Sequence, residues 1–282
     1  MRNPVWVWDL PFAPMTLSET VDAVSALVES RRPSFFITAN THYAMLTKKH
    51  PDLHAVNTRA TFLVADGAPL VWASRWQGTP LPERVAGSDL IFDLCARAAE
   101  REYGVFLLGG ATGVAEEAAR RLCRLYPRLR IVGIESPPFR APTAEEHAAL
   151  VARIRAARPD LLFVAFGQPK GEFWIADHLQ ALGVPVCVQV GASLDFVVGQ
   201  VRRAPRPLQR LGLEWAYRMW REPRRLGPRY ARNARFLLGM VARDLFRGIG
   251  LHISEFASSA DSSRARLTRL QDLKGTTIPR VP

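Results

Sequence analysis

Most of the side chains that could act on a small molecule come directly after apolar runs. Asp66 follows the run TFLVA, while Thr38, Asn40 and His42 lie at and after the end of SFFIT. A carboxylate gains little from such a position unless it caps a helix, holds a partner or does chemistry. Asp66 is therefore a candidate general base, with a cap for the next helix as the alternative. Thr38 and Asn40 could equally be turn residues, and His42 fits a packed helix face better than a ligand site.

Three later apolar runs end in glycines and polar residues that suit a nucleotide. These residues are Gly109 and Gly110 in GGATG, Gly167 and Gln168 in GQPKGEFW, and Gly191 and Asp195 in GASLDF. A helix that begins at such a turn offers free backbone N–H groups to an anion. GGATG does not match the G-x-G-x-x-G fingerprint, so it is a weak signal by itself. Asp195 suits a ribose or uracil group, and a helix N-cap is its alternative role.

The elements that must position these residues alternate along the first 200 residues. Apolar runs at 34–38, 61–65, 104–109, 129–134, 160–166 and 184–190 predict strands that are buried on both faces. Amphipathic stretches lie between them, with cap signals at Ser18 and at Thr143, where Glu146 completes a capping box. The pattern predicts an α/β fold with a Rossmann-like, mainly parallel sheet and flanking helices. Ligands bind beyond the carboxyl ends of such strands, so the polar residues should meet at one edge.

Length and cysteine content limit the class of protein. The 282 residues, 48% of them hydrophobic, suffice for one large domain or for a domain with an appendage. Because no apolar run is long enough to span a bilayer and the N-terminus does not resemble a signal peptide, we expect a cytoplasmic protein. Cys95, Cys123 and Cys187 lie far apart in apolar surroundings, which predicts buried thiols rather than disulfides or a zinc site.

The formal net charge of +12 is concentrated near the C-terminus. Between Arg202 and Arg247 thirteen arginines stand against three acidic residues, a local net charge of +10, whereas the first 201 residues are nearly neutral. This tail also places Leu211, Trp215 and Met219 at helical intervals, which predicts amphipathic helices with an anionic partner. We therefore predict an α/β catalytic domain (1–200), a basic, membrane-associating helical appendage (201–250) and a polar, disordered tail (251–282).

Five segments carry a family resemblance. They are TANTHYAML, ADGAPLVWASRWQGTPLPERVAGSDL, LLGGATG, VAFGQPKGEFW, and GASLDF with the arginine-rich LEWAYRMWREPRRLGPRY that follows it. In this order they resemble the WecG/TagA/CpsF family of bacterial glycosyltransferases, over about residues 5–245. The most specific pieces are DGAPLVW, PERVAGSDL and the arginine-rich segment. Residues 248–282 fall outside the resemblance.

The resemblance implies an inverting transferase that acts in cell-surface polysaccharide synthesis. Its donor would be a UDP-sugar carrying N-acetylmannosamine, the corresponding uronic acid or glucose. Its acceptor would be a saccharide on undecaprenyl diphosphate, at the anionic cytoplasmic face of the bacterial inner membrane. The matching positions imply Asp66 as the base, surrounded by Thr38, Asn40, Arg84 and Gln168. They also imply that the acceptor diphosphate is contacted by Arg218, Arg225 and Arg229. A homo-oligomer is left open.

An inverting transfer needs one base on the acceptor side and positive charge or N–H donors for the departing UDP. Many sugar-nucleotide enzymes hold Mg²⁺ with an Asp-x-Asp pair, and this chain contains no such pair. We therefore expect no metal and no other cofactor, with arginines and helix N-termini in that role. For Arg84 the alternative is a surface ion pair with Glu83 or Asp89.

Two other classes of protein share some of these sequence features. A nucleotide-dependent oxidoreductase is disfavoured, because no G-x-G-x-x-G follows the first strand with an acid about 20 residues further on. A nucleic-acid-binding protein could use the arginine-rich tail. The aromatic residues of that tail recur at helical intervals, which is typical of an apolar helix face rather than of stacking platforms for bases. We therefore expect no nucleic-acid partner.

Overall fold

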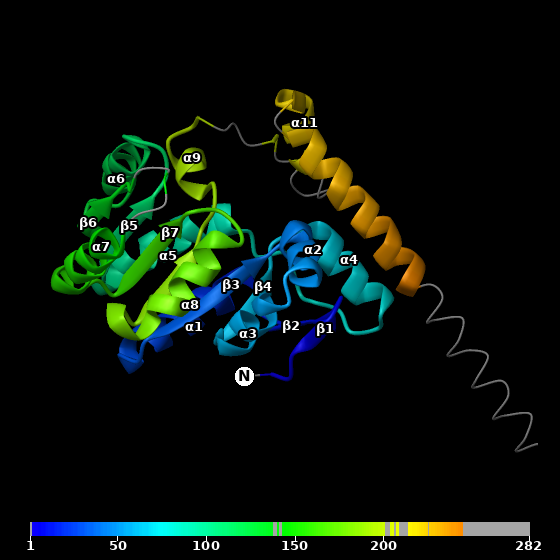
Figure 1. Cartoon of the computed structure of the whole chain (residues 1–282), viewed down its shortest axis with the longest axis horizontal. Helices are drawn as coiled ribbons and strands as arrows, with labels where there is room; N and C mark the ends of the chain where they lie inside the picture. Colours follow the sequence, from blue (N-terminus) through cyan, green and yellow to red (C-terminus); the bar gives the residue numbers. More distant parts are fainter. Residues whose placement is uncertain are drawn as a thin grey trace, which may run out of the picture. The chain divides into compact units, whose positions relative to one another are not determined.

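The centre of the structure is a twisted, eight-stranded sheet. A computed structural model of the chain describes residues 2–137, 140, 143–200, 204–205, 207–208, 214–224 and 226–244. Within these residues the strand order is β1-β2-β4-β3-β8-β7-β5-β6 (Figure 1). β1 and β2 are antiparallel, and the other neighbouring strands are parallel. The predicted α/β fold with a mainly parallel sheet is confirmed.

The six predicted strands are present within one or two residues of the expected bounds. They are β3 (Ser34–Ala39), β4 (Phe62–Ala65), β5 (Gly104–Gly109), β6 (Arg130–Glu135), β7 (Leu161–Ala165) and β8 (Val186–Gln189). All but the edge strand β6 are buried along almost their whole length. The hairpin of β1 (Val5–Val7) and β2 (Leu10–Phe12) was not predicted, because strands of three residues are too short to show a periodic pattern.

Helices cover both faces of the sheet. The contacts group α1 (Leu17–Ser30), α5 (Gly87–Arg101), α6 (Val114–Leu125) and the short α9 (Ser193–Val197) on one face. They group α2 (Thr41–Lys49), α3 (Asp52–Arg59), α7 (Ala144–Ala157) and α8 (Lys170–Leu182) on the other (Figure 1). The remaining helix of this region, α4 (Ala68–Trp76), contacts β1. Each parallel strand is thus joined to the next through a helical crossover.

One of the two predicted helix caps is correct. Thr143 caps α7 in a capping box with Glu146, as expected. Ser18 does not cap α1, because the N-cap lies two residues earlier at Thr16, which forms a capping box with Glu19. Thr16-x-x-Glu19 fits the capping-box pattern itself, and Ser18 lies inside the first turn.

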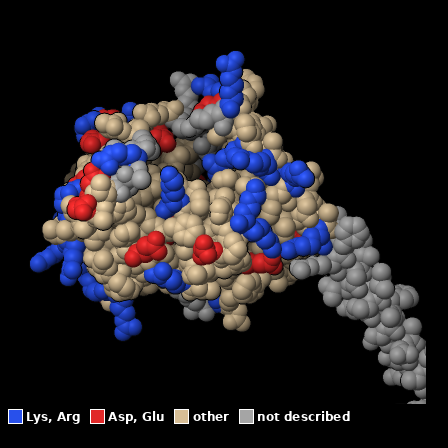
Figure 2. Space-filling model, in the orientation of Figure 1, with Lys and Arg blue, Asp and Glu red and all other residues tan. Residues whose placement is uncertain are grey.

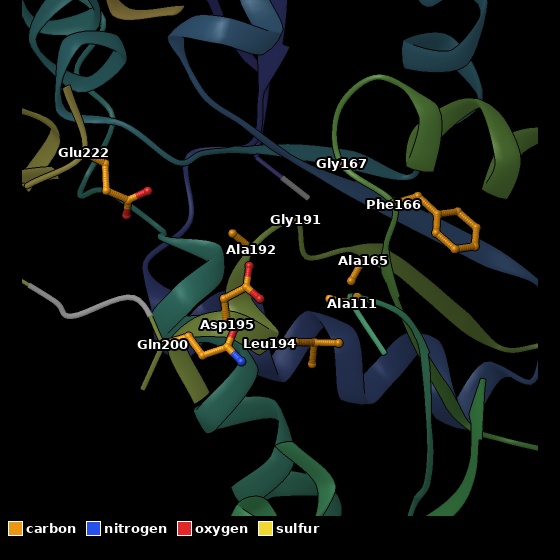
Figure 3. A pocket seen from close by; sticks show the side chains of 11 residues that line it. Ala111, Ala165, Phe166, Gly167, Gly191, Ala192, Leu194, Asp195, Gln200 and Glu222 are labelled. Atoms are coloured by element: carbon orange, nitrogen blue, oxygen red, sulfur yellow. The ribbon is translucent and has the colours of Figure 1, made fainter. Parts of the chain in front are cut away.

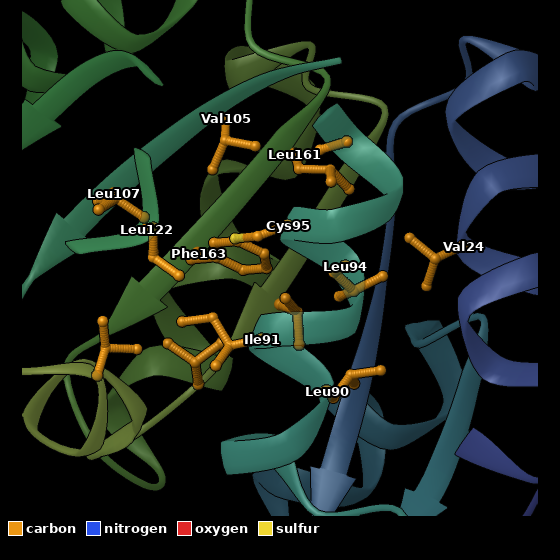
Figure 4. Packing of buried hydrophobic residues seen from close by; sticks show 14 of the residues in the cluster. Val24, Leu90, Ile91, Leu94, Cys95, Val105, Leu107, Leu122, Leu161 and Phe163 are labelled. Atoms are coloured by element: carbon orange, nitrogen blue, oxygen red, sulfur yellow. The ribbon is translucent and has the colours of Figure 1, made fainter. Parts of the chain in front are cut away.

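A large hydrophobic core lies between the sheet and the α1, α5, α6 layer. Leu90, Ile91 and Leu94 of α5 recur at helical spacing and pack with Phe163 of β7 and Val24 of α1 (Figure 4). Their near-complete burial makes the sheet a rigid platform for the loops at its carboxyl edge. The predicted burial of thiols holds for Cys95 and Cys187, which are fully enclosed, whereas Cys123 is only half-buried.

The chain divides into two compact units, residues 1–233 and residues 234–282. In the first unit, α11 (Glu214–Arg221) and residues 226–233 are helical, and in the second unit residues 234–244 are helical. The predicted tail at 251–282 lies outside the described residues. The predicted boundaries at 200 and 250 therefore stay predictions. Among the helices that the structure describes, none is both long enough and apolar enough to cross a membrane.

Candidate active site

The carboxyl ends of β3 and β4 bring Asp66 and Asn40 to the same edge of the sheet. Ala39 and Ala65 are partners in the parallel ladder, and the Asp66 N–H donates to the Ala39 carbonyl at 2.8 Å. The next residue, Gly67, lies against Asn40, since a Cβ added to Gly67 would be 3.9 Å from Asn40 Cβ. The two chain segments therefore leave the sheet side by side, as parallel strands require.

The structure separates the catalytic and capping explanations for these two residues. The N-cap of α4 is Gly67, which has no side-chain capping bond, so the alternative of Asp66 as a helix cap is wrong. Asn40 does cap a helix, because its Oδ1 accepts a hydrogen bond from the Tyr43 N–H at 3.0 Å at the start of α2. The Asp66 carboxyl therefore does not cap α4, the helix that follows it in the chain.

Asp66, Thr38 and Ser193 converge on the first residue of α5. The Gly87 N–H donates to the Asp66 carboxylate. A Cβ added to Gly87 would lie 3.4 Å from Thr38 Oγ1, 3.7 Å from Asp66 Oδ2 and 3.7 Å from Ser193 Oγ. Gly87 and Ser193 were not predicted as site residues. The available signal for Gly87 was its place in PERVAGSDL, where a glycine opens an amphipathic helix.

The surroundings of Asp66 suit a base that works near neutral pH. Burial raises the pKa of Asp66 to about 6, against the lowering effects of the Arg84 guanidinium and the Gly87 N–H. The carboxylates of Glu214 and Asp89 raise this pKa further. A general base is most effective when its pKa lies close to the working pH, because it is then both ionised and reasonably basic.

Arg84 lies between two acids beside Asp66. Its Nη2 is 3.5 Å from Asp89 Oδ2, and its Nη1 is 3.6 Å from Glu214 Oε2. The suggested pairing with Asp89 is therefore present, whereas Glu83 accepts a bond from the Leu17 N–H instead. Both distances exceed the 2.7–2.9 Å or so of a close charge-assisted hydrogen bond. Arg84 is thus held near the base by loose pairs that a phosphate oxygen can replace.

Glu214 could not be located from the sequence, since it lies 130 residues from Arg84 along the chain. α11 brings it to the site, and its side chain is mostly buried there. Glu214 is in the first turn of a basic helix, and an acid at such a position is normally explained by a favourable interaction with the helix dipole. Its residue type and local position therefore did not mark it as a site residue.

Gln168 completes the predicted group around Asp66. Its Nε2 donates to the Thr38 backbone carbonyl at 3.2 Å, which links the loop after β7 to the end of β3. Its Oε1 is buried and has no partner among the described residues. The structure therefore brings Thr38, Asn40, Arg84 and Gln168 together near the candidate base, on three different connections of the sheet.

A pocket of about 660 Å³ adjoins this group (Figure 3). It is lined by Gly110, Ala111, Ala165, Phe166, Gly167, Gly191, Ala192, Leu194, Asp195, Gln200 and Glu222. The volume is in the range of small-molecule sites. Ser193 lies between two lining residues and its hydroxyl approaches Gly87, so the wall of the pocket continues into the Asp66 corner.

Four of the residues predicted to bind a nucleotide line this pocket, and two do not. Gly110, Gly167, Gly191 and Asp195 are in its wall, whereas Gly109 and Gln168 are not. Gly109 is a glycine for a structural reason: its φ is +99°, and an added Cβ would lie 3.0 Å from the Ala165 backbone.

The polar wall of the pocket carries carboxylates. Asp195 and Gln200 project from the segment around α9, and Glu222 comes from a separate segment (Figure 3). Glu222 was not predicted. Carboxylates accept hydrogen bonds from sugar hydroxyls but repel phosphates. This part of the pocket therefore suits a ribose or a base edge, and a diphosphate fits better toward Gly110 and the Arg84 side.

On the face of the molecule that carries α6, α7 and β6, the charged side chains do not form a patch of a single sign (Figure 2). Acidic and basic groups are intermixed over α6, α7 and β6 (Figure 2). Many of them pair locally, as Arg121 does with Glu117 and Arg153 with Glu135. Recognition of an anionic donor must therefore depend on individual groups in the site.

One of the three predicted diphosphate contacts can be placed. Burial lowers the pKa of His42, and the positive charge of Arg229 lowers it further. The His42 Nδ1 is 3.1 Å from Asn233 Oδ1, so residues 229–233 lie beside the start of α2. His42 follows Asn40 by two residues, which places Arg229 on the Asp66 side of the sheet. Arg225 and the side chain of Arg218 lie outside the described residues.

The prediction of a metal-free site is not tested by the structure. In the described ranges, no three His, Cys, Asp or Glu side chains come together as a potential ligand set. The prediction that no cofactor is needed therefore rests on the chemistry of the donor groups and on the experiments below.

The fold and the site together are those of an α/β enzyme that acts on a ligand at the carboxyl edge of its sheet. The chain belongs to the WecG/TagA/CpsF glycosyl transferase family, which it matches over residues 5–249. It is 32% identical over 212 residues to an N-acetylglucosaminyldiphosphoundecaprenol N-acetyl-beta-D-mannosaminyltransferase of Bacillus spizizenii, covering 74% of this chain and 80% of the relative. It is 28% identical over 231 residues to a protein of the same name from Bacillus subtilis, covering 80% and 88%. The chain is therefore a glycosyltransferase, as the motifs indicated, rather than an oxidoreductase or a nucleic-acid-binding module.

Proposed function

We propose that this enzyme transfers N-acetylmannosamine from its UDP-sugar to N-acetylglucosaminyl-diphosphoundecaprenol, with inversion at the anomeric carbon. The names of both relatives contain this acceptor and a β-linked N-acetylmannosamine product. They favour this sugar over its uronic acid and over glucose. A β product from an α-linked nucleotide sugar requires a single displacement, which is consistent with one base rather than with a base and a nucleophile.

The observation that carries the proposal is the position of Asp66. Its carboxyl lies at the end of β4 beside Arg84 and the N-terminus of α5, and burial raises its pKa to about 6. In the reaction Asp66 accepts the proton of the acceptor hydroxyl as that oxygen bonds to the anomeric carbon. The bond from the anomeric carbon to the UDP oxygen breaks on the opposite face, and its electron pair leaves with the diphosphate.

The departing UDP gains negative charge that protein groups must stabilise. Arg84 is the cation that lowers the pKa of Asp66, and its loose pairs with Asp89 and Glu214 allow it to turn toward a phosphate. The ribose and uracil are assigned to the pocket beside Asp195, and no divalent metal is assigned.

The acceptor is assigned to the side of the site that carries Arg229. Arg218 and Arg225 are proposed to contact its diphosphate with Arg229, since a guanidinium pairs with two phosphate oxygens at once. Because an undecaprenyl chain stays in the bilayer, the enzyme is proposed to work as a peripheral protein on the anionic cytoplasmic face of the inner membrane.

A donor screen tests this proposal. The full-length enzyme is incubated with a synthetic N-acetylglucosaminyl lipid diphosphate and, separately, the UDP-sugars of N-acetylmannosamine, N-acetylmannosaminuronic acid, glucose and N-acetylglucosamine. Mass spectrometry follows the lipid product, and the matched control is a lipid diphosphate without the sugar. We expect a disaccharide product from UDP-N-acetylmannosamine alone. A product from another donor, or from the sugar-free lipid, would show that the proposed substrates are wrong.

A further inference from the structure

Three polar side chains next to the site each keep one buried atom without a partner. Glu172, in the first turn of α8, is 1% exposed, and Gln189, the last residue of β8, is 3% exposed. In this group, the atoms that have no partner among the described residues are Gln168 Oε1, Glu172 Oε2 and Gln189 Nε2. Buried polar atoms are almost always hydrogen-bonded, so a cluster of exceptions needs an explanation.

These side chains lie directly behind the predicted site. Gly171 packs on Gln189, because a Cβ added to Gly171 would lie 2.2 Å from Gln189 Cγ. Gln168, one turn before Glu172, bonds to the Thr38 carbonyl through Nε2 and also interacts with the Glu172 carboxyl. The Gln168 amide therefore stands between the site and the buried acid.

No cation in the described part of the chain compensates Glu172. Burial raises its pKa, its own backbone N–H and Gln168 lower it, and no described lysine or arginine affects it. On the elements packed against α8, Arg59 of α3 bonds to the Ala176 carbonyl, and the His147 ring of α7 lies tilted against the His178 ring. Tyr43 of α2 is the ionisable group that Glu172 does influence, and it is neutral at ordinary pH because burial and Glu172 both raise its pKa. An ionised carboxylate without a cationic partner is unfavourable in such surroundings, which favours the protonated form of Glu172 near neutral pH.

We propose that Glu172 is a positioning residue for Gln168, with its carboxyl proton donated to the Gln168 carbonyl oxygen. The Gln168 Nε2 then pairs with the other Glu172 oxygen and with the Thr38 carbonyl, and the two side chains form a closed acid–amide pair. This arrangement gives partners to Gln168 Oε1 and Glu172 Oε2 at once. The second lone pair of Gln168 Oε1 is left for a hydroxyl of the donor sugar.

Loss of the proton breaks this arrangement. Two oxygens that can only accept would then face each other, and the amide would rotate away from Thr38. Burial raises the pKa of Glu172 to about 8, so this change begins in the mildly alkaline range. The effect on transfer rests on the proposed function, whereas the protonation of Glu172 does not.

The test compares three variants in transfer assays from pH 7 to pH 9.5. We expect the wild-type kcat to fall by about tenfold per pH unit above pH 8. E172Q keeps a donor for Gln168 and cannot ionise, so its rate at pH 7 should stay within about threefold of wild type, without the alkaline decline. E172L removes the hydrogen-bond donor to Gln168 and should raise the KM for the sugar donor about tenfold at pH 7. E116Q is the matched control, because Glu116 is another acid in the first turn of a helix with an unpartnered oxygen, and it should keep the wild-type profile.

A second measurement does not depend on turnover. Carbon-13 NMR of side-chain-labelled glutamates, assigned with E172Q, should show Glu172 titrating near pH 8. Titration near pH 4.5, or an E172Q enzyme with the wild-type alkaline decline, overturns the inference. If E172L does not fold, the E172Q profile and the NMR titration decide. A wild-type enzyme without any transfer, but with Glu172 titrating near pH 8, contradicts the proposed function and leaves the acid–amide pair standing.

Discussion

Replacing Gly87 with alanine places one methyl group where Thr38, Asp66 and Ser193 meet. The new Cβ would lie 3.4 Å from Thr38 Oγ1 and 3.7 Å from both Asp66 Oδ2 and Ser193 Oγ. These are contact distances rather than overlaps, and Gly87 is the first residue of α5. Alanine favours a helix over glycine by about 0.5–1 kcal/mol in a helix interior, and by less at the first position. We therefore expect G87A to fold with an unfolding free energy equal to or slightly above that of wild type.

Transfer should respond in the opposite direction. A general base must approach the hydroxyl it deprotonates to about 2.6–3.2 Å, and the methyl group occupies space beside that carboxyl. A misplacement of about 1 Å can reduce a rate by about 100-fold. We expect kcat/KM to fall by about that factor, which corresponds to about 2.7 kcal/mol of transition-state stabilisation.

The assay pairs denaturant unfolding with the initial rate of lipid-linked product formation. The matched control is G227A at a helical glycine, where an added Cβ would meet no described atom within 4 Å beyond its chain neighbours and its own helix backbone. G227A should show a similar small stabilisation with an unchanged rate on a short-chain acceptor that does not need a membrane. A stable G87A enzyme with wild-type turnover would refute the placement of the reaction at the α5 N-terminus.

Three further predictions concern charge. In R84A the pKa of Asp66 should rise above about 6, because Arg84 lowers it, so the acid limb of the pH–rate profile should move to higher pH; an unmoved limb would separate Arg84 from the base. Transfer should proceed in EDTA and gain little from Mg²⁺ or Mn²⁺, and a strict requirement for a divalent ion would show that the leaving-group site is misassigned. A chain that ends at Val201 should lose liposome binding and transfer but still bind UDP, and R218A/R225A should reduce transfer more than liposome binding. Full turnover by the truncated chain would contradict a role for the appendage.

The long buried strands and the edge that carries the site could be predicted from sequence. β3, β5 and β7 are apolar at almost every position, and that pattern is specific to strands covered on both faces. Parallel strands place Asp66 and Asn40 at the same edge of the sheet, and the pairing of β3 with β4 then brings them together. β1 and β2 escaped prediction because three residues are too few for a periodic signal, although they extend the sheet beyond β4.

The missing site residues depend on tertiary contacts. Glu214 reaches Arg84 only through the docking of α11, and no local pattern encodes that contact. Glu172 was missed for another reason: an acid in the first turn of a helix is ordinarily a surface partner of the helix dipole, and only its burial reveals a different role. Gly87 is visible as a helix start, but its closeness to Asp66 follows from the packing of α5 on the sheet.

The central claim is that Asp66 takes the proton from the acceptor, and the pH–rate profile of D66N tests it most directly. The pKa of Asp66 is raised from 3.8 to about 6, so the folded state loses stability as pH rises through this interval, and D66N should be at least as stable as wild type at pH 7. The wild-type rate should fall as pH drops below about 6, where the carboxylate becomes protonated. We expect D66N to transfer at least about 100-fold more slowly at pH 7 and to lack this acid limb. A folded D66N enzyme that keeps wild-type turnover and the same acid limb would contradict the assignment of Asp66 as the base.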